Sequence, residues 1–76
     1  MKDLVSHLAR GLVREPGRVR VHEHVEHGRI FVELTVAPAD RGRVIGREGR
    51  TAKAIRTLLD ALAARREGTV SLEILD

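Results

Sequence analysis

A short segment at the centre of the chain carries the residues whose types and spacing could do chemistry. In Val44-Ile45-Gly46-Arg47-Glu48-Gly49, two apolar residues run into a Gly-x-x-Gly sequence. The glycines let the backbone turn tightly and leave its N–H groups accessible. A helix-forming stretch follows over residues 50–66, and a helix start adds free N–H donors and the positive end of its dipole. The segment could therefore hold a phosphate or the sugar-phosphate backbone of a nucleic acid.

The distribution of charge singles out the same part of the chain. The net charge is +3, but residues 1–40 have none and residues 57–76 have a net charge of −2. Residues 41–56 have a net charge of +5, because five arginines and a lysine accompany a single acid, Glu48. A solvated helix face could produce such a cluster, but its coincidence with a phosphate-competent loop favours an anion-binding patch.

Composition narrows the class of protein. Hydrophobic residues make up 42% of the 76 residues and are nearly all aliphatic, enough for one small core. The absence of Cys excludes disulfides and thiolate metal sites. No apolar run approaches the roughly 20 residues of a membrane span, and the first residues lack a signal-peptide core, so we expect a cytoplasmic protein. Phe31 is the only Phe, Trp or Tyr, which leaves almost no stacking platform for bases.

Apolar periodicity predicts the elements of the first half of the chain. Residues 2–14 have the single apolar stripe of a helix, which Glu15-Pro16-Gly17 ends. Residues 18–25 and 30–36 alternate in polarity and form a hairpin, because Gly28 between them accepts a positive φ.

The second half predicts two helices and a strand. Ala37-Pro38-Ala39-Asp40 opens a short helix that ends at Gly46, and a longer helix over residues 50–66 stops at Glu67-Gly68. Residues 69–75 form the last strand, and the order is α-β-β-α-α-β. We expect an α+β fold with a three-stranded sheet covered on one face by three helices. The apolar stripe predicted for the longer helix consists of Ile55, Leu58, Leu59 and Leu62.

This element order, with Val-Ile-Gly-x-x-Gly between two helices, resembles a KH domain of type II (prokaryotic) topology that spans residues 1–76. Residues 36–56 are similar to the KhpA family of small bacterial proteins that consist of a single KH domain. The resemblance implies that the loop and its flanking helices clamp about four nucleotides of single-stranded RNA. It also implies homodimers or a heterodimer with a second KH protein, KhpB (also called Jag or EloR).

The resemblance further implies an RNA chaperone or post-transcriptional regulator linked to cell elongation, division and peptidoglycan homeostasis. We expect no cofactor and no enzymatic activity, because the chain has no paired-carboxylate constellation and no Walker-type loop. The residues that the resemblance assigns to RNA binding lie in the loop and on both flanking helices. We expect phosphate contacts first from Arg47 and Arg50, and then from Arg43 and Lys53. The full predicted set is Arg43, Val44, Ile45, Gly46, Arg47, Glu48, Gly49, Arg50 and Lys53.

Three points stay open at this level. Val44 and Ile45 before the loop, and Ala52 and Ile55 after it, could line either the groove or the core. Glu48 stands where many KH loops have a basic, polar or glycine residue. It could weaken RNA binding by repelling phosphate, or it could complement the dipole at the start of the helix. Ala52 replaces a larger aliphatic residue, which predicts a shallower groove or close packing of two chains.

The alternative function that these points leave open is a dimerising protein-interaction module with weak, non-specific RNA binding.

Other polar residues do not point to a catalytic or metal site. His22 and His24 share one strand face with His27 in the adjacent turn, but zinc needs three or four converging ligands, so we expect exposed histidines and no metal. Asp3, Ser6 and His7 lie on one short helix without an oxyanion loop, so we expect no catalytic triad. Glu23 interrupts an apolar strand face, and we expect it to be exposed at a sheet edge or strand end, because unpaired burial is costly.

Overall fold

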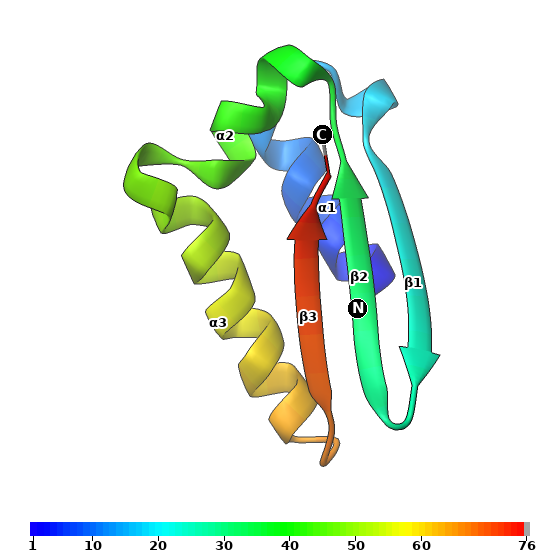
Figure 1. The fold of residues 1–76 in the computed structure, drawn as a ribbon. Helices are drawn as coiled ribbons and strands as arrows, with labels where there is room; N and C mark the ends of the chain where they lie inside the picture. The colour runs from blue at the N-terminus through cyan, green and yellow to red at the C-terminus, as the bar shows by residue number, and fades with distance from the viewer. Residues whose placement is uncertain (76) are drawn as a thin grey trace.

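The computed structural model describes residues 1–75, and Asp76, the last residue of the predicted domain, lies outside them. One mixed sheet has the strand order β1-β2-β3, in which β1 is antiparallel to β2 and β2 is parallel to β3 (Figure 1). Short 3-10 turns precede β1 and flank α2. The predicted α+β fold and its order are confirmed. The elements are α1 (Lys2–Leu12), β1 (Arg20–Glu26), β2 (Arg29–Thr35), α2 (Arg41–Ile45), α3 (Arg50–Ala64) and β3 (Thr69–Ile74).

The core is aliphatic and lies between the helices and one face of the sheet. Leu34 of β2 and Leu59 of α3 are both 0% exposed, and burial of a leucine side chain contributes about 1.5–3 kcal/mol. All three helices and the strands β2 and β3 contribute buried residues, so the sheet is covered from one side. The buried cluster consists of Val5, Ala9, Val19, Val32, Leu34, Val36, Val44, Ile55, Leu59, Ala63, Val70 and Leu72.

Gly28 and Gly68 lie in the two connections at one end of the sheet. His27 and Gly28 both have positive φ, 49° and 79°, as the two-residue turn of a tight hairpin requires. A Cβ on Gly68 would lie 3.3 Å from the carbonyl oxygen of Gly28, so the connection from α3 to β3 passes close to the hairpin. The left-handed residue after α3 is Glu67, with φ 55°, within the predicted stop at Glu67-Gly68.

The predicted apolar stripe of α3 is partly wrong, because the buried face is rotated about the helix axis relative to the prediction. Leu58 is 42% exposed, whereas two alanines, Ala52 and Ala63, are 3% and 1% exposed and face the core with Ile55 and Leu59. Small side chains on the inner face let α3 approach its neighbours closely. The other bounds differ by one or two residues, except that α2 begins only at Arg41, because Pro38–Asp40 forms a 3-10 turn. Strand β1 starts at Arg20 because Pro16–Arg18 forms a 3-10 turn.

Glu23 lies on the covered face of β1, which is an edge strand. Its side chain is half-buried, and its Oε1 accepts a hydrogen bond of 3.1 Å from the backbone N–H of Lys2. A free N–H at a helix start therefore supplies a partner for the acid that interrupts the apolar face. Strand β1 is an edge strand as predicted, but the predicted exposure of Glu23 is wrong, because the side chain is half-buried and this hydrogen bond compensates its burial.

Candidate nucleic-acid interface

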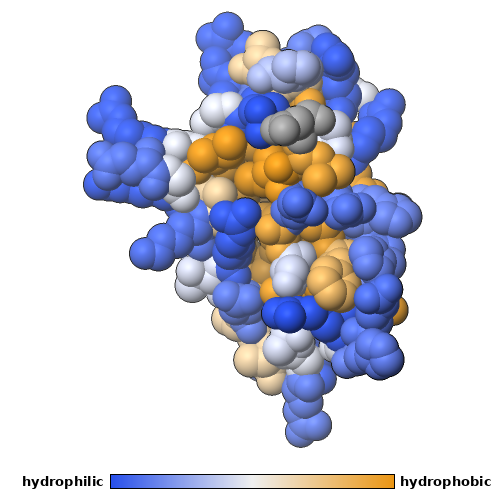
Figure 2. Space-filling model, viewed as in Figure 1, coloured by the Kyte–Doolittle hydropathy of each residue, from blue (hydrophilic) through white to orange (hydrophobic). Residues whose placement is uncertain are grey.

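The Gly-x-x-Gly loop joins α2 to α3 through two changes of backbone direction. Gly46 ends α2 with φ 78° and ψ 170°, a conformation that is essentially restricted to glycine. Glu48 and Gly49 then adopt left-handed conformations, with φ 56° and 74°, and α3 begins at Arg50. Figures 1 and 2 show the loop as a hydrophilic projection at the left of the molecule, beside a band of hydrophobic surface.

Two exposed side chains of opposite charge share the tip of this loop. Arg50 Nη2 lies 3.7 Å from Glu48 Oε2, and the two side chains are 77% and 73% exposed. No side-chain hydrogen bond caps the start of α3 within residues 1–75, so Glu48 is paired with Arg50 rather than bonded to the helix start. An exposed ion pair of this kind is weak and screened by salt, so a phosphate can compete for Arg50.

Asp40 fixes the approach of α2 to the loop. Its side chain is 3% exposed, and its two oxygens accept hydrogen bonds from the backbone N–H groups of Arg14 and Glu15, at 3.2 and 3.1 Å. Arg43 Nε lies 3.5 Å from Asp40 Oδ1 and is itself 43% exposed. Asp40 thus connects the segment after α1 to α2. It also holds Arg43, which is predicted to contact phosphate, in place.

The structure divides the predicted site residues into three groups. Arg43, Arg47, Glu48, Arg50 and Lys53 are exposed around the loop. Val44 is 0% exposed and belongs to the core, so its side chain has no surface for a ligand and positions the loop instead. Ile45, Gly46 and Gly49 are half-buried, while Ala52 and Ile55 belong to the buried face of α3.

Comparison with known proteins identifies this arrangement. The family model described as KhpA/KhpB, KH domain, matches residues 2–74. The chain belongs to this KH-domain family. Proteins named RNA-binding protein KhpA are similar to it over their whole length. The protein of Halalkalibacterium halodurans is 47% identical over 76 residues, which cover 100% of both chains. That of Chlamydia caviae is 47% identical over 76 residues, which cover 100% of this chain and 97% of the relative.

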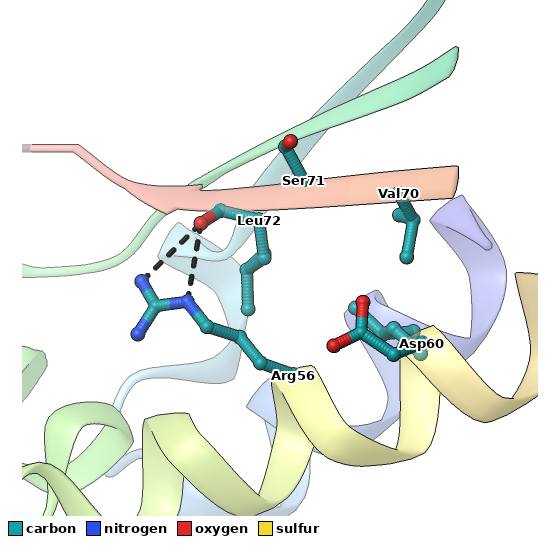
Figure 3. Close-up of a pocket in the computed structure, with 6 residues that line it drawn as sticks. Arg56, Asp60, Val70, Ser71 and Leu72 are labelled. Carbon is teal, nitrogen blue, oxygen red and sulfur yellow. Dashed lines mark hydrogen bonds between the residues drawn. The ribbon is translucent and has the colours of Figure 1, made fainter.

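A cleft between α3 and β3 extends the surface of this KH domain beyond the loop. Its lining residues are Arg56, Leu59, Asp60, Val70, Ser71 and Leu72. The Nε and Nη2 atoms of Arg56 donate hydrogen bonds of 3.4 and 3.2 Å to the carbonyl oxygen of Leu72 (Figure 3). Arg56 belongs to the predicted basic cluster of residues 41–56 but not to the predicted site. Its position on the same face of α3 as Lys53 and Asp60, at helical spacing, was the available signal.

The uncovered face of the sheet carries two of the four histidines. His22 and His24 are exposed there, and the ring of His24 stacks on Phe31 with 5.0 Å between centroids. Within residues 1–75, no group of three or more His, Cys, Asp or Glu side chains could hold a metal ion. Nor is any helix in this range long and apolar enough to cross a membrane.

Proposed function

We propose that this KH domain binds single-stranded RNA by clamping its backbone at the loop between α2 and α3. The observation that carries the proposal is the backbone of this loop, which reverses direction at Gly46 and delivers the start of a 15-residue helix directly behind Gly49. The relatives named RNA-binding protein KhpA support the same ligand class.

The charges around the loop suit a phosphate backbone. Arg47 and Arg50 stand on or beside the loop, and Arg43 and Lys53 lie one turn away on the flanking helices. Arginine presents a planar set of donors that matches phosphate oxygens, and the start of α3 adds N–H donors and a positive dipole end. In this mechanism a phosphate of the bound RNA replaces the carboxylate of Glu48 as the partner of Arg50. Glu48 therefore lowers affinity without preventing binding.

The hydrophobic band beside the loop in Figure 2 provides a surface for the bases of the bound strand. Aromatic residues are 1% of the chain, so stacking on aromatic rings cannot give strong selection among bases. We therefore infer that affinity comes mainly from backbone contacts at the loop. Any selection among bases comes from hydrogen bonds between the protein and the edges of the bases.

A second candidate, a dimerising interaction module, is favoured by apolar surface on the helical side. Leu12 of α1 and Leu58 of α3 are 37% and 42% exposed. An apolar groove lies between these helices, lined by His7, Leu8, Gly11, Leu12, Thr51, Ala54 and Ile55. We infer that a second KH domain, either another copy or KhpB, covers this side. The two functions are compatible, because a dimer presents two loops to one RNA.

We place the proposed activity in the cytoplasm, where an RNA chaperone or post-transcriptional regulator would meet its targets. A link to cell elongation, division and peptidoglycan homeostasis would then act through the RNAs that are bound. This part of the proposal follows from family membership rather than from any contact in the structure.

The experiment that tests RNA binding is fluorescence anisotropy with a labelled single-stranded octanucleotide RNA and a duplex of the same sequence. We expect tighter binding of the single strand. Its affinity should fall with salt, with a logarithmic slope of about −0.7 for each phosphate contacted. Equal affinity for both forms, or affinity independent of salt, would contradict a backbone clamp.

A further inference from the structure

The cleft between α3 and β3 has the size and lining of a site for one nucleobase. Its volume is about 230 Å³, below the roughly 300–1,000 Å³ typical of sites for drug-sized ligands. Val70 and Leu72, each 8% exposed, give the cleft an apolar floor, and Leu59, which is 0% exposed, packs beneath them. Charged groups from α3 stand at its edge. Such a lining offers van der Waals contact to the ring and hydrogen bonds to its periphery.

Arg56 is held at one end of the cleft. Two of its nitrogens donate to the carbonyl oxygen of Leu72, which points away from β2 at the outer edge of the sheet. A guanidinium has five N–H donors, so these two bonds leave the Nη1 donors and one Nη2 donor for a ligand. Because the carbonyl oxygen of Leu72 already accepts both of these hydrogen bonds, we do not expect it to bind a base.

Asp60 supplies the opposite chemistry at the other end. It follows Arg56 by four residues, a spacing at which opposite charges on a helix commonly pair. Within residues 1–75 the structure shows no such pair, and Arg56 turns to β3 instead. The carboxylate of Asp60 lies toward the cleft in Figure 3. Two acceptor oxygens therefore stand at the cleft without a basic partner from the described part of the chain.

We propose that this cleft is a guanine subsite for the RNA strand that the loop clamps, an inference that rests on the proposed function. Guanine has two adjacent donors, N1–H and N2–H, on its Watson–Crick edge. One carboxylate can accept both in parallel. The remaining donors of Arg56 face the acceptors O6 and N7, a pairing that arginine commonly makes with guanine. Adenine, cytosine and uracil each present only one donor group on this edge, so the carboxylate of Asp60 favours guanine.

The position of the cleft fits a strand clamped at the loop. Arg56 is six residues beyond Arg50, about 9 Å along the axis of α3, and Asp60 is about 15 Å beyond it. A four-nucleotide segment spans roughly 14 Å when its bases are stacked, and more when it is extended. A base one to three nucleotides from the clamp therefore reaches the cleft. The carboxylate of Asp60 would repel a phosphate, so it faces a base rather than the backbone.

Anisotropy titrations with oligouridine octamers that contain guanosine, inosine or adenosine at one central position test the subsite. Inosine keeps N1–H and O6 but lacks the N2 amino group. We expect the native protein to bind the guanosine octamer about tenfold more tightly than the inosine or adenosine octamers, as expected for loss of a hydrogen bond to a charged group. The Asp60→Asn variant should bind all three equally, because its amide cannot accept two bonds in parallel.

Glu26→Gln provides the matched control, since it removes one exposed negative charge far from the cleft. It should keep the preference for guanosine, whereas Asp60→Asn should lose it. If the native protein binds all three octamers with equal affinity, the guanine subsite is wrong while RNA binding stands. If the native protein binds none of them, both the proposed function and the subsite fall. If Asp60→Asn retains the preference, Asp60 is not the reading group and the inference is overturned.

Discussion

Gly46 and Thr51 are so close that the loop has no room for a side chain at position 46. A Cβ on Gly46 would lie 2.8 Å from the backbone nitrogen of Thr51 and would also overlap the hydroxyl of that residue. The hydroxyl could rotate away, but the backbone nitrogen is fixed within the first turn of α3. The close approach of these two residues sets the angle at which α2 meets α3.

We therefore predict that Gly46→Ala destabilises the fold by about 2–4 kcal/mol, from a conformation that disfavours L residues together with the overlap at Thr51. Gly49→Ala should cost only about 1 kcal/mol, because its φ is 74° but, among residues 1–75, no atom beyond its chain neighbours lies within 4 Å of the added Cβ. Urea denaturation of both variants gives the comparison. Equal losses of stability would show that the contact with Thr51 does not matter.

Asp40→Ala should destabilise the protein by about 3 kcal/mol. The substitution removes the acceptor for the N–H groups of Arg14 and Glu15, which hold the segment after α1 against α2. Asp40→Asn should cost less, because its amide oxygen still accepts from one of them. Guanidinium denaturation of both variants tests this order of stabilities. An alanine variant as stable as the native protein would mean that the two hydrogen bonds contribute nothing.

Replacing Glu67 by glycine should stabilise the protein by about 0.5 kcal/mol. Its φ of 55° is unfavourable for a residue with a Cβ, and this gain exceeds the entropy that glycine adds to the unfolded chain. The matched control is Ala61→Gly, an exposed position inside α3 at which glycine should cost about 1 kcal/mol. Thermal melting distinguishes the two. A loss of stability in both variants would refute the strain assigned to Glu67.

Leu58→Asp tests whether α3 forms a contact between two KH domains. Leu58 is 42% exposed, so the substitution should change the stability of the isolated fold by less than about 0.5 kcal/mol. If two copies associate through this face, light scattering should show a dimer for the native protein and a monomer for the variant. A native protein that is monomeric at micromolar concentration would contradict the association of two copies through this face.

The sequence predicted the loop, the element order and the basic patch, because each depends on residues that are close together in the chain. It did not predict the buried face of α3. Leu58 outweighs Ala52 and Ala63 in hydrophobicity, but the tight approach of α3 to its neighbours selects the smaller side chains for the core. Periodicity therefore identified the helix but not its rotation about its own axis.

The cleft at Arg56 could not be predicted for a different reason. The contact between Arg56 and Leu72 joins residues 16 apart in the chain and depends on how α3 lies along the outer edge of β3. The pairing of Glu23 with Lys2 depends in the same way on where α1 starts relative to β1. Local patterns of residues do not fix such relations between elements.

The RNA affinity of the Arg47→Asp, Glu48→Asp double variant tests most directly whether the loop between α2 and α3 clamps RNA. Arg65→Asp is the matched control, because it changes the net charge by the same amount on an exposed residue beyond the far end of α3. With a single-stranded octanucleotide, we predict at least an about tenfold loss of affinity for the loop variant and a much smaller loss for the control. Equal losses would show that RNA responds only to net charge and would contradict the clamp.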